Sequence, residues 1–177
     1  MRAVFLDRDG VLNRPIVRSG RPYPPETLEQ FEIYPDACAA LTSLRRAGFR
    51  LIVVTNQPDV ARGSQTRHRV EAMHARLRET LPLDEIRVCY HDDGECQCRK
   101  PLPGLLLADS TIDASGSFMV GDRWRDIEAG RNAGCTTIFV DRGYEEGCTV
   151  QPDVTVCSVA EAAAWIRDYA KTRQRPY

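Results

Sequence analysis

Short apolar runs alternate along this chain with segments whose apolar residues recur at helical spacing. The runs lie at 3–6, 51–54, 86–89, 118–120, 137–140 and 153–156, and each is too short for a helix. Helical spacing is present at 36–47, 66–81, 123–132 and 159–169, and we expect a further helix over 105–107. Strands that alternate with helices are typical of an α/β fold, here a Rossmann-like doubly wound parallel sheet covered on both faces.

The connecting segments give no indication of a second domain. A length of 177 residues predicts one domain over 1–177. The segment 14–34 is rich in Pro, Gly and charge, so we expect a long loop or small flap that leans over one edge of the sheet. No inserted stretch is long enough to form a separate cap domain.

The charge balance excludes several classes of partner. Lys and Arg total 24 against 25 Asp and Glu, for a formal net charge of -1. This balance predicts no nucleic-acid partner and no membrane association. The first strand begins almost at the N-terminus, which leaves no room for a signal peptide, so we expect a cytoplasmic protein. We also expect a monomer. We expect the basic tail 173–175 to be solvated.

Polar side chains follow three of the predicted strands at the point where each strand ends. They are Asp7, Asp9, Thr55, Asn56 and Asp122, and Lys100 precedes the helix expected over 105–107. The carboxyl ends of parallel strands meet at one edge of a sheet, where α/β proteins bind ligands. Asp9-Gly10 is also a common turn sequence for backbone reasons alone.

These groups fit phosphoryl transfer through an aspartyl-phosphate. Asp7 is the expected nucleophile, and Asp9 the acid that protonates the leaving alcohol and the base that activates water. Mg²⁺ is expected on Asp7, Asp122 and the backbone carbonyl of Asp9. Thr55 and Lys100 are expected to hold the phosphoryl oxygens.

A cysteine-rich loop at 89–101 carries a second metal signal. Cys89, His91, Cys96 and Cys98 supply three thiolates and one imidazole, which suits a closed, structural Zn²⁺ site. Free cysteines in a flexible loop are the alternative. The other four cysteines, expected to be buried apolar residues, are Cys38, Cys135, Cys148 and Cys157. His68 and His74 on the predicted helix 66–81 are expected at the surface or with satisfied partners.

The motifs resemble those of the haloacid-dehalogenase-like phosphatases. They are Asp7-Arg8-Asp9-Gly10-Val11, Thr55, Lys100, and Gly121-Asp122 with Asp126, in the order of that family. With Asn13, Ala61-Arg62-Gly63 and Cys98-Arg99-Lys100-Pro101, the chain resembles more narrowly the D-glycero-D-manno-heptose 1,7-bisphosphate 7-phosphatases. The histidinol-phosphate phosphatases are close relatives. The resemblance supports a zinc loop and a small phosphorylated sugar as substrate.

The resemblance also implies further substrate contacts. Phosphate or substrate contacts are expected from Arg8, Asn13, Asn56 and Arg62, and Arg99 and Arg123 could clamp a second phosphate. The segment Gln57-Pro58-Asp59-Val60 departs from the Gln-Ser-Gly of that family, so sugar specificity there could differ. We therefore predict a Mg²⁺-dependent phosphatase acting on the C7 phosphate of a heptose 1,7-bisphosphate. The alternatives are a histidinol-phosphate phosphatase and a non-catalytic phosphate- or zinc-binding module.

Overall fold

A computed structural model describes residues 1–173 of the chain. Six parallel strands form its central sheet in the order β5-β4-β1-β6-β7-β8. Their bounds are β1 Ala3–Leu6, β4 Arg50–Asn56, β5 Glu85–Cys89, β6 Phe118–Gly121, β7 Thr136–Val140 and β8 Val154–Val156. The central neighbours β4, β1 and β6 are the three strands whose ends carry the candidate chemistry.

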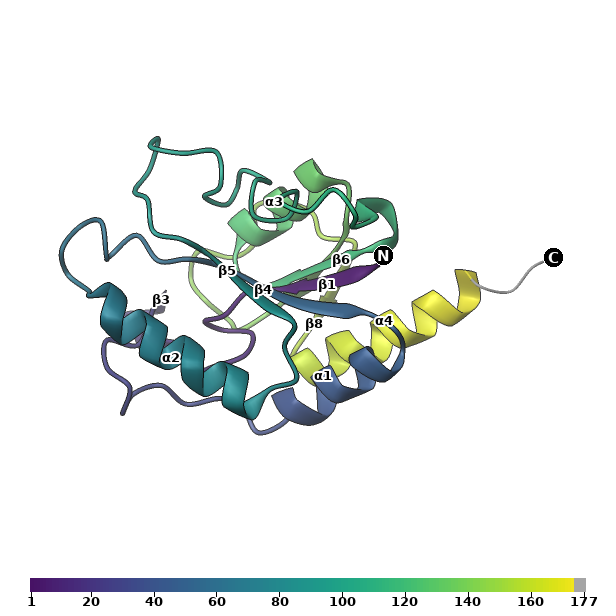
Figure 1. Ribbon diagram of the computed structural model, residues 1–177, viewed down its shortest axis with the longest axis horizontal. Coiled ribbons are helices and arrows are strands. Elements are labelled where there is room, and N and C mark those ends of the chain that lie inside the picture. The colour runs from purple at the N-terminus through teal and green to yellow at the C-terminus, as the bar shows by residue number, and fades with distance from the viewer. Residues whose placement is uncertain (174–177) are drawn as a thin grey trace.

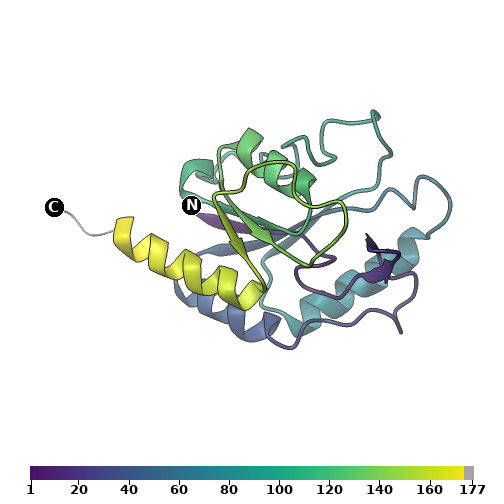
Figure 2. The same cartoon turned by 180° about the vertical axis from the view of Figure 1, so that it is seen from behind.

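Helices cover both faces of the sheet (Figures 1 and 2). Their bounds are α1 Ala37–Arg46, α2 Arg67–Thr80, α3 Trp124–Ala133 and α4 Val159–Arg173, with a short 3₁₀ turn η1 at Ala114–Gly116. Val4 and Leu6 of β1 pack with α1, α2 and α4, whereas Ala3 and Phe5 pack with α3 on the opposite face. This period-two alternation is what a strand buried on both faces requires.

The segment 14–34 contains a small antiparallel hairpin that the sequence pattern did not predict. Its strands are β2 Ile16–Arg18 and β3 Arg21–Tyr23, and they form a sheet of their own. Pro15, Pro22 and Pro24 of this segment line the cavity described below. The hairpin therefore covers part of the sheet edge at which the candidate residues lie.

The expected parallel sheet is confirmed, and so are most element boundaries. Thr66, the first residue of the helix expected over 66–81, is the N-cap of α2, since its Oγ1 accepts a hydrogen bond from Arg69 N at 3.3 Å. Gly134 ends α3 at a φ of 83°, a left-handed conformation that favours glycine. Among the described residues, no helix is both long enough and apolar enough to cross a membrane. Gln174 and Arg175 of the expected solvated tail lie outside the described residues.

The helix expected over 105–107 is wrong, because this segment forms turns only. The carbonyl oxygens of Leu105 and Leu106 accept hydrogen bonds from Arg87 Nη1 at 2.8 and 3.4 Å. Those carbonyls are therefore bound by a side chain from β5. Leu105 and Leu106 are nevertheless buried and contribute to the core, as apolar residues do.

The structure also tests the positions expected for single histidines and cysteines. His68 is exposed, as expected. His74 is fully buried, and its Nε2 lies 3.2 Å from Arg8 Nη1, but its Nδ1 has no hydrogen-bond partner among the described residues. Of the four cysteines outside the metal-like cluster, Cys135 is buried and Cys148 is partly buried. Cys38 and Cys157 are exposed, which corrects the expectation that all four are buried. Composition alone does not show which helix face or loop carries a given residue.

Candidate active site

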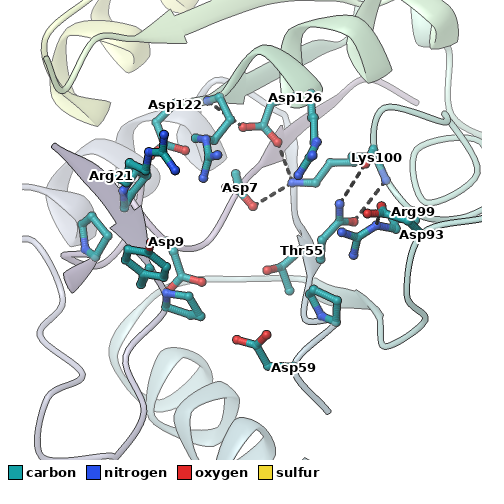
Figure 3. Close-up of a pocket in the computed structure, with 18 of the residues that line it drawn as sticks. Asp7, Asp9, Arg21, Thr55, Asp59, Asp93, Arg99, Lys100, Asp122 and Asp126 are labelled. Atoms are coloured by element: carbon teal, nitrogen blue, oxygen red, sulfur yellow. Dashed lines mark hydrogen bonds and ion pairs between the residues drawn. The ribbon is translucent and has the colours of Figure 1, made fainter. Parts of the chain in front are cut away.

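A cavity of about 590 Å³ lies at the carboxyl ends of β1, β4 and β6. Figure 3 shows Asp7 at its centre, between Asp122 and Asp126 on one side and Thr55 on the other. The predicted residues that line it are Asp7, Asp9, Thr55, Asn56, Arg62, Arg99, Lys100, Asp122 and Arg123. The parallel register brings the strand-end residues among them together, because all three strands end at the same edge, whereas Lys100 and the arginines come from the segments outside the strands.

Lys100 joins two carboxylates at the floor of the cavity. Its Nζ lies 2.7 Å from Oδ1 of Asp7 and 2.7 Å from Oδ1 of Asp126 (Figure 3). Burial opposes the charge on the ammonium, but the attraction of Asp126 and Asp7 outweighs it and raises the pKa of Lys100. Asn56 fixes this residue by donating to Lys100 O at 2.9 Å and accepting from Lys100 N at 3.1 Å. The Lys100 side chain is therefore positively charged and held beside Asp7.

Three buried carboxylates gather where a cation is expected. Oxygens of Asp7, Asp122 and Asp126 lie within 4.8 Å of one another. Burial, and then repulsion by Asp126, raises the pKa of Asp7 to about 6, and burial followed by repulsion from Asp7 raises the pKa of Asp122. Oδ1 of Asp122 is buried and makes no hydrogen bond within the described chain. A hard, oxygen-binding cation such as Mg²⁺ fits this donor set and would relieve the repulsion.

Asp9 is held by three other side chains at the cavity wall. Arg8 Nη2 lies 2.8 Å from its Oδ2, Asn13 Nδ2 lies 2.9 Å from its Oδ1, and Gln57 Nε2 lies 3.1 Å from its Oδ2. Arg8 and Asn13 are fully buried and are not among the residues that line the cavity, so their contacts with substrate stay a prediction. In the structure both side chains orient Asp9.

Thr55 presents its hydroxyl to the cavity from the end of β4. Its Oγ1 accepts a hydrogen bond from Gln57 Nε2 at 3.1 Å, and the residue is 1% exposed. The hydroxyl hydrogen has no acceptor among the described residues, so it is available to a bound oxygen. This placement matches the expected role of a donor to phosphate.

The predicted arginines lie on the cavity wall in ion pairs with carboxylates. Arg62 Nη2 is 2.6 Å from Asp92, Arg99 Nε is 2.6 Å from Asp93, and Arg123 Nη2 is 2.6 Å from Glu146. Arg21 and Arg125 also line the cavity, although the sequence did not indicate them, and neither has an ion pair among the described residues. The spacing Arg123-x-Arg125 beside Asp126 was the signal that could have indicated Arg125.

The cysteine loop forms a separate cluster after β5. Sγ of Cys96 lies 3.5 Å from Sγ of Cys89 and 3.3 Å from Sγ of Cys98, and Nδ1 of His91 lies 3.6 and 3.4 Å from Cys89 and Cys98. Tetrahedral Zn²⁺ with Zn–S bonds of about 2.3 Å separates neighbouring sulfurs by about 3.8 Å. The four side chains are thus close to the spacing that a tetrahedral zinc site needs.

Comparisons with known proteins agree on one family. A HAD-hydrolase-like family model matches residues 97–162. A D-glycero-beta-D-manno-heptose-1,7-bisphosphate 7-phosphatase of Pseudomonas aeruginosa is 39% identical over 79% of this chain and 81% of its own length. The corresponding D-glycero-D-manno-heptose enzyme of Thermosynechococcus vestitus is 35% identical over 93% of this chain and 94% of its own.

A solved structure agrees with these sequence relatives. The D,D-heptose 1,7-bisphosphate phosphatase from B. bronchiseptica, complexed with magnesium and phosphate, superposes with a TM-score of 0.80 at 27% identity. The match covers 96% of this chain and 100% of that one. The chain described here therefore belongs to the haloacid-dehalogenase-like hydrolases, in the family of the D-glycero-D-manno-heptose 1,7-bisphosphate 7-phosphatases.

Proposed function

We propose that this chain is a Mg²⁺-dependent phosphatase that removes the C7 phosphate of D-glycero-D-manno-heptose 1,7-bisphosphate. The observation that carries the proposal is the pairing of Asp7 with Lys100 in a cavity that a second carboxylate, Asp9, also lines. The named activity of the relatives supports the same substrate. A pure binding module on this fold would need no acid beside its nucleophile.

In the first step, one oxygen of Asp7 forms a bond to the substrate phosphorus as the phosphorus–oxygen ester bond breaks. Asp9 donates its proton to the departing sugar oxygen, which leaves as an alcohol. In the second step, water attacks the aspartyl-phosphate while Asp9 takes up the proton. Asp7 is regenerated, and inorganic phosphate leaves.

The remaining side chains hold charge during these steps. Lys100 keeps Asp7 oriented and offers its positive charge to the phosphoryl oxygens, and Thr55 donates its hydroxyl to one of them. Asp7, Asp122 and the backbone carbonyl of Asp9 would hold Mg²⁺. When bound there, the ion supplies positive charge that lets an anionic carboxylate approach an anionic phosphate.

The cluster of Cys89, His91, Cys96 and Cys98 would hold a structural Zn²⁺. Four protein ligands leave no open position on the ion, so we assign it no part in the chemistry. Arg99 and Lys100 follow Cys98 directly, and Arg99 N lies 3.3 Å from Cys96 Sγ. A fixed loop would therefore fix both cations at the cavity.

The decisive experiment measures Mg²⁺-dependent phosphate release from a panel of substrates, with Asp7→Asn as the control for contaminating phosphatase. The panel holds heptose 1,7-bisphosphate, sugar monophosphates, histidinol phosphate and p-nitrophenyl phosphate. We expect the highest kcat/KM on the bisphosphate. Preference for histidinol phosphate would identify a histidinol-phosphate phosphatase instead, and no turnover would indicate a binding module.

Four further expectations stay predictions: a cytoplasmic location, a monomer, a single domain, and a flap formed by 14–34. Light scattering would test the monomer.

A further inference from the structure

One loop after β7, residues 141–147, contacts four separate parts of the active site. Arg142 Nε donates to Gly10 O at 2.8 Å, and Tyr144 OH donates to Asp122 Oδ2 at 2.8 Å. Glu145 N donates to Gly20 O of the hairpin at 3.1 Å. Glu146 forms an ion pair with the cavity residue Arg123. The loop thus joins the segment after Asp7, a buried carboxylate, the hairpin and a cavity arginine.

The two carboxylate oxygens of Asp122 differ in their hydrogen bonding. Oδ2 is occupied by the phenol, whereas the buried Oδ1 makes no hydrogen bond to any described residue. An unpartnered buried carboxylate oxygen is costly unless a donor or a cation binds it. Asp122 belongs to the carboxylate cluster with Asp7 and Asp126, and Oδ1 is the oxygen of Asp122 that the phenol leaves without a hydrogen bond. The phenol therefore favours the carboxylate orientation that leaves Oδ1 for a cation.

Local backbone geometry supports this arrangement. Gly10 has a φ of +87°, and a Cβ built on it would lie 1.8 Å from Asp122 Oδ2 and 3.0 Å from Tyr144 OH. Any side chain at this position would therefore displace the pair. The hydrogen bond from Arg142 to Gly10 O holds the same turn from the side of the loop.

We propose that Tyr144 is a positioning residue for the active-site cation, because it fixes Asp122 with Oδ1 available as a ligand. This inference rests on the proposed assignment of Asp7 and Asp122 as cation ligands. Hydrogen-bond partners of metal ligands commonly change metal affinity about 10–100-fold when removed. Tyr144 touches neither the substrate phosphorus nor the nucleophile in this role.

Binding of Mn²⁺, used as a probe for the Mg²⁺ site, tests the proposal without turnover. The free-ion EPR signal gives the dissociation constant, and competition with Mg²⁺ gives the affinity for the natural ion. We expect Tyr144→Phe to weaken binding about 10–100-fold while far-UV circular dichroism and zinc content stay as in the wild type. With saturating Mg²⁺, most of the lost kcat should return.

Tyr34→Phe is the matched control. The Tyr34 ring packs under Arg142 at 4.2 Å, and its hydroxyl makes no hydrogen bond among residues 1–173. Its affinity for Mn²⁺ should equal that of the wild type. Equal losses in both variants would show a general packing effect, and a Tyr144→Phe affinity within about twofold of the wild type would also overturn the proposal.

Asp122→Asn separates the failure of this inference from the failure of the proposed metal site. If Asp122→Asn loses Mn²⁺ binding and Tyr144→Phe does not, the metal site stands and the role of Tyr144 is refuted. If Asp122→Asn binds Mn²⁺ as the wild type does, the assignment of the metal ligands is refuted as well.

Discussion

Nζ of Lys100 lies 2.7 Å from Oδ1 of Asp7, although 93 positions separate the two residues in the sequence. Both side chains are almost completely buried, so their attraction is poorly screened by water. The contact links the end of the central strand β1 to the residues that follow the cysteine loop. It brings a cation to the carboxylate that we propose as the nucleophile.

We expect Asp7→Asn to abolish phosphate release while the fold is retained, because an amide cannot form the acyl-phosphate. Asp9→Asn should be nearly inactive but should still accumulate phospho-enzyme slowly, since the nucleophile is intact. Phosphate release and acid-quenched labelling measure the two effects. Asp168→Asn, at an exposed ion pair with Lys171, is the control. Substantial Mg²⁺-dependent turnover by Asp7→Asn would refute the assignment of the nucleophile.

We expect about one zinc ion per chain in protein purified without added metal. Cys96→Ser should lower the zinc content and the thermal stability, because a structural zinc can contribute on the order of 10 kcal/mol of apparent binding free energy. Elemental analysis and thermal unfolding measure both effects. Cys157→Ser, at an exposed cysteine outside the cluster, should change neither. Wild-type protein without zinc would contradict the prediction.

Arg99→Ala and Arg123→Ala should lower kcat/KM on a heptose bisphosphate about ten- to a hundredfold. The reason is the loss of a charged partner for the phosphate that does not react. The same changes should matter little for p-nitrophenyl phosphate, which has no second anion. Arg46→Ala, at an exposed arginine of α1, is the control. Equal losses on both substrates would assign the two arginines to the common chemistry or to structure.

We expect the free energy of unfolding to depend on pH because of the buried His74. Burial, and then the nearby charge of Arg8, lowers the pKa of His74 to about 4 from an ordinary value of 6.5. Between these values the unfolded chain binds a proton that the folded chain does not. The stabilising effect is therefore complete above pH 6.5 and is lost as the pH falls toward 4. The expected loss from this group between pH 7 and pH 5 is about 2 kcal/mol.

Urea unfolding at pH 7 and pH 5 measures this loss. His74→Gln should lose less stability than the wild type over the same interval, whatever its stability at pH 7. His68→Gln, at an exposed position of the same helix, should follow the wild type. Identical pH dependence in wild type and His74→Gln would contradict the predicted burial effect.

The order of the motifs determined the family and the fold. Asp7 and Asp122 follow apolar runs, and β1 is apolar throughout because its side chains alternate between two faces that are both buried. Strand ends gather at one edge of a parallel sheet by topology, so the location of Thr55 could be predicted without coordinates. The spacing of Cys89, His91, Cys96 and Cys98 was likewise sufficient to predict a cluster, because its ligands are local in sequence.

Contacts between segments distant in sequence were decided only by the tertiary structure. The neighbour of a buried residue depends on which loops and helices pack there, and no local pattern encodes that choice. Arg8 belongs to a phosphatase motif, yet its guanidinium is buried against Asp9 and His74. Tyr144 lies in a loop without periodicity and reaches Asp122 only because β6 and β7 are neighbours in the sheet. The sequence by itself thus determined the chemical groups and the sheet edge, and packing determined which side chains orient them.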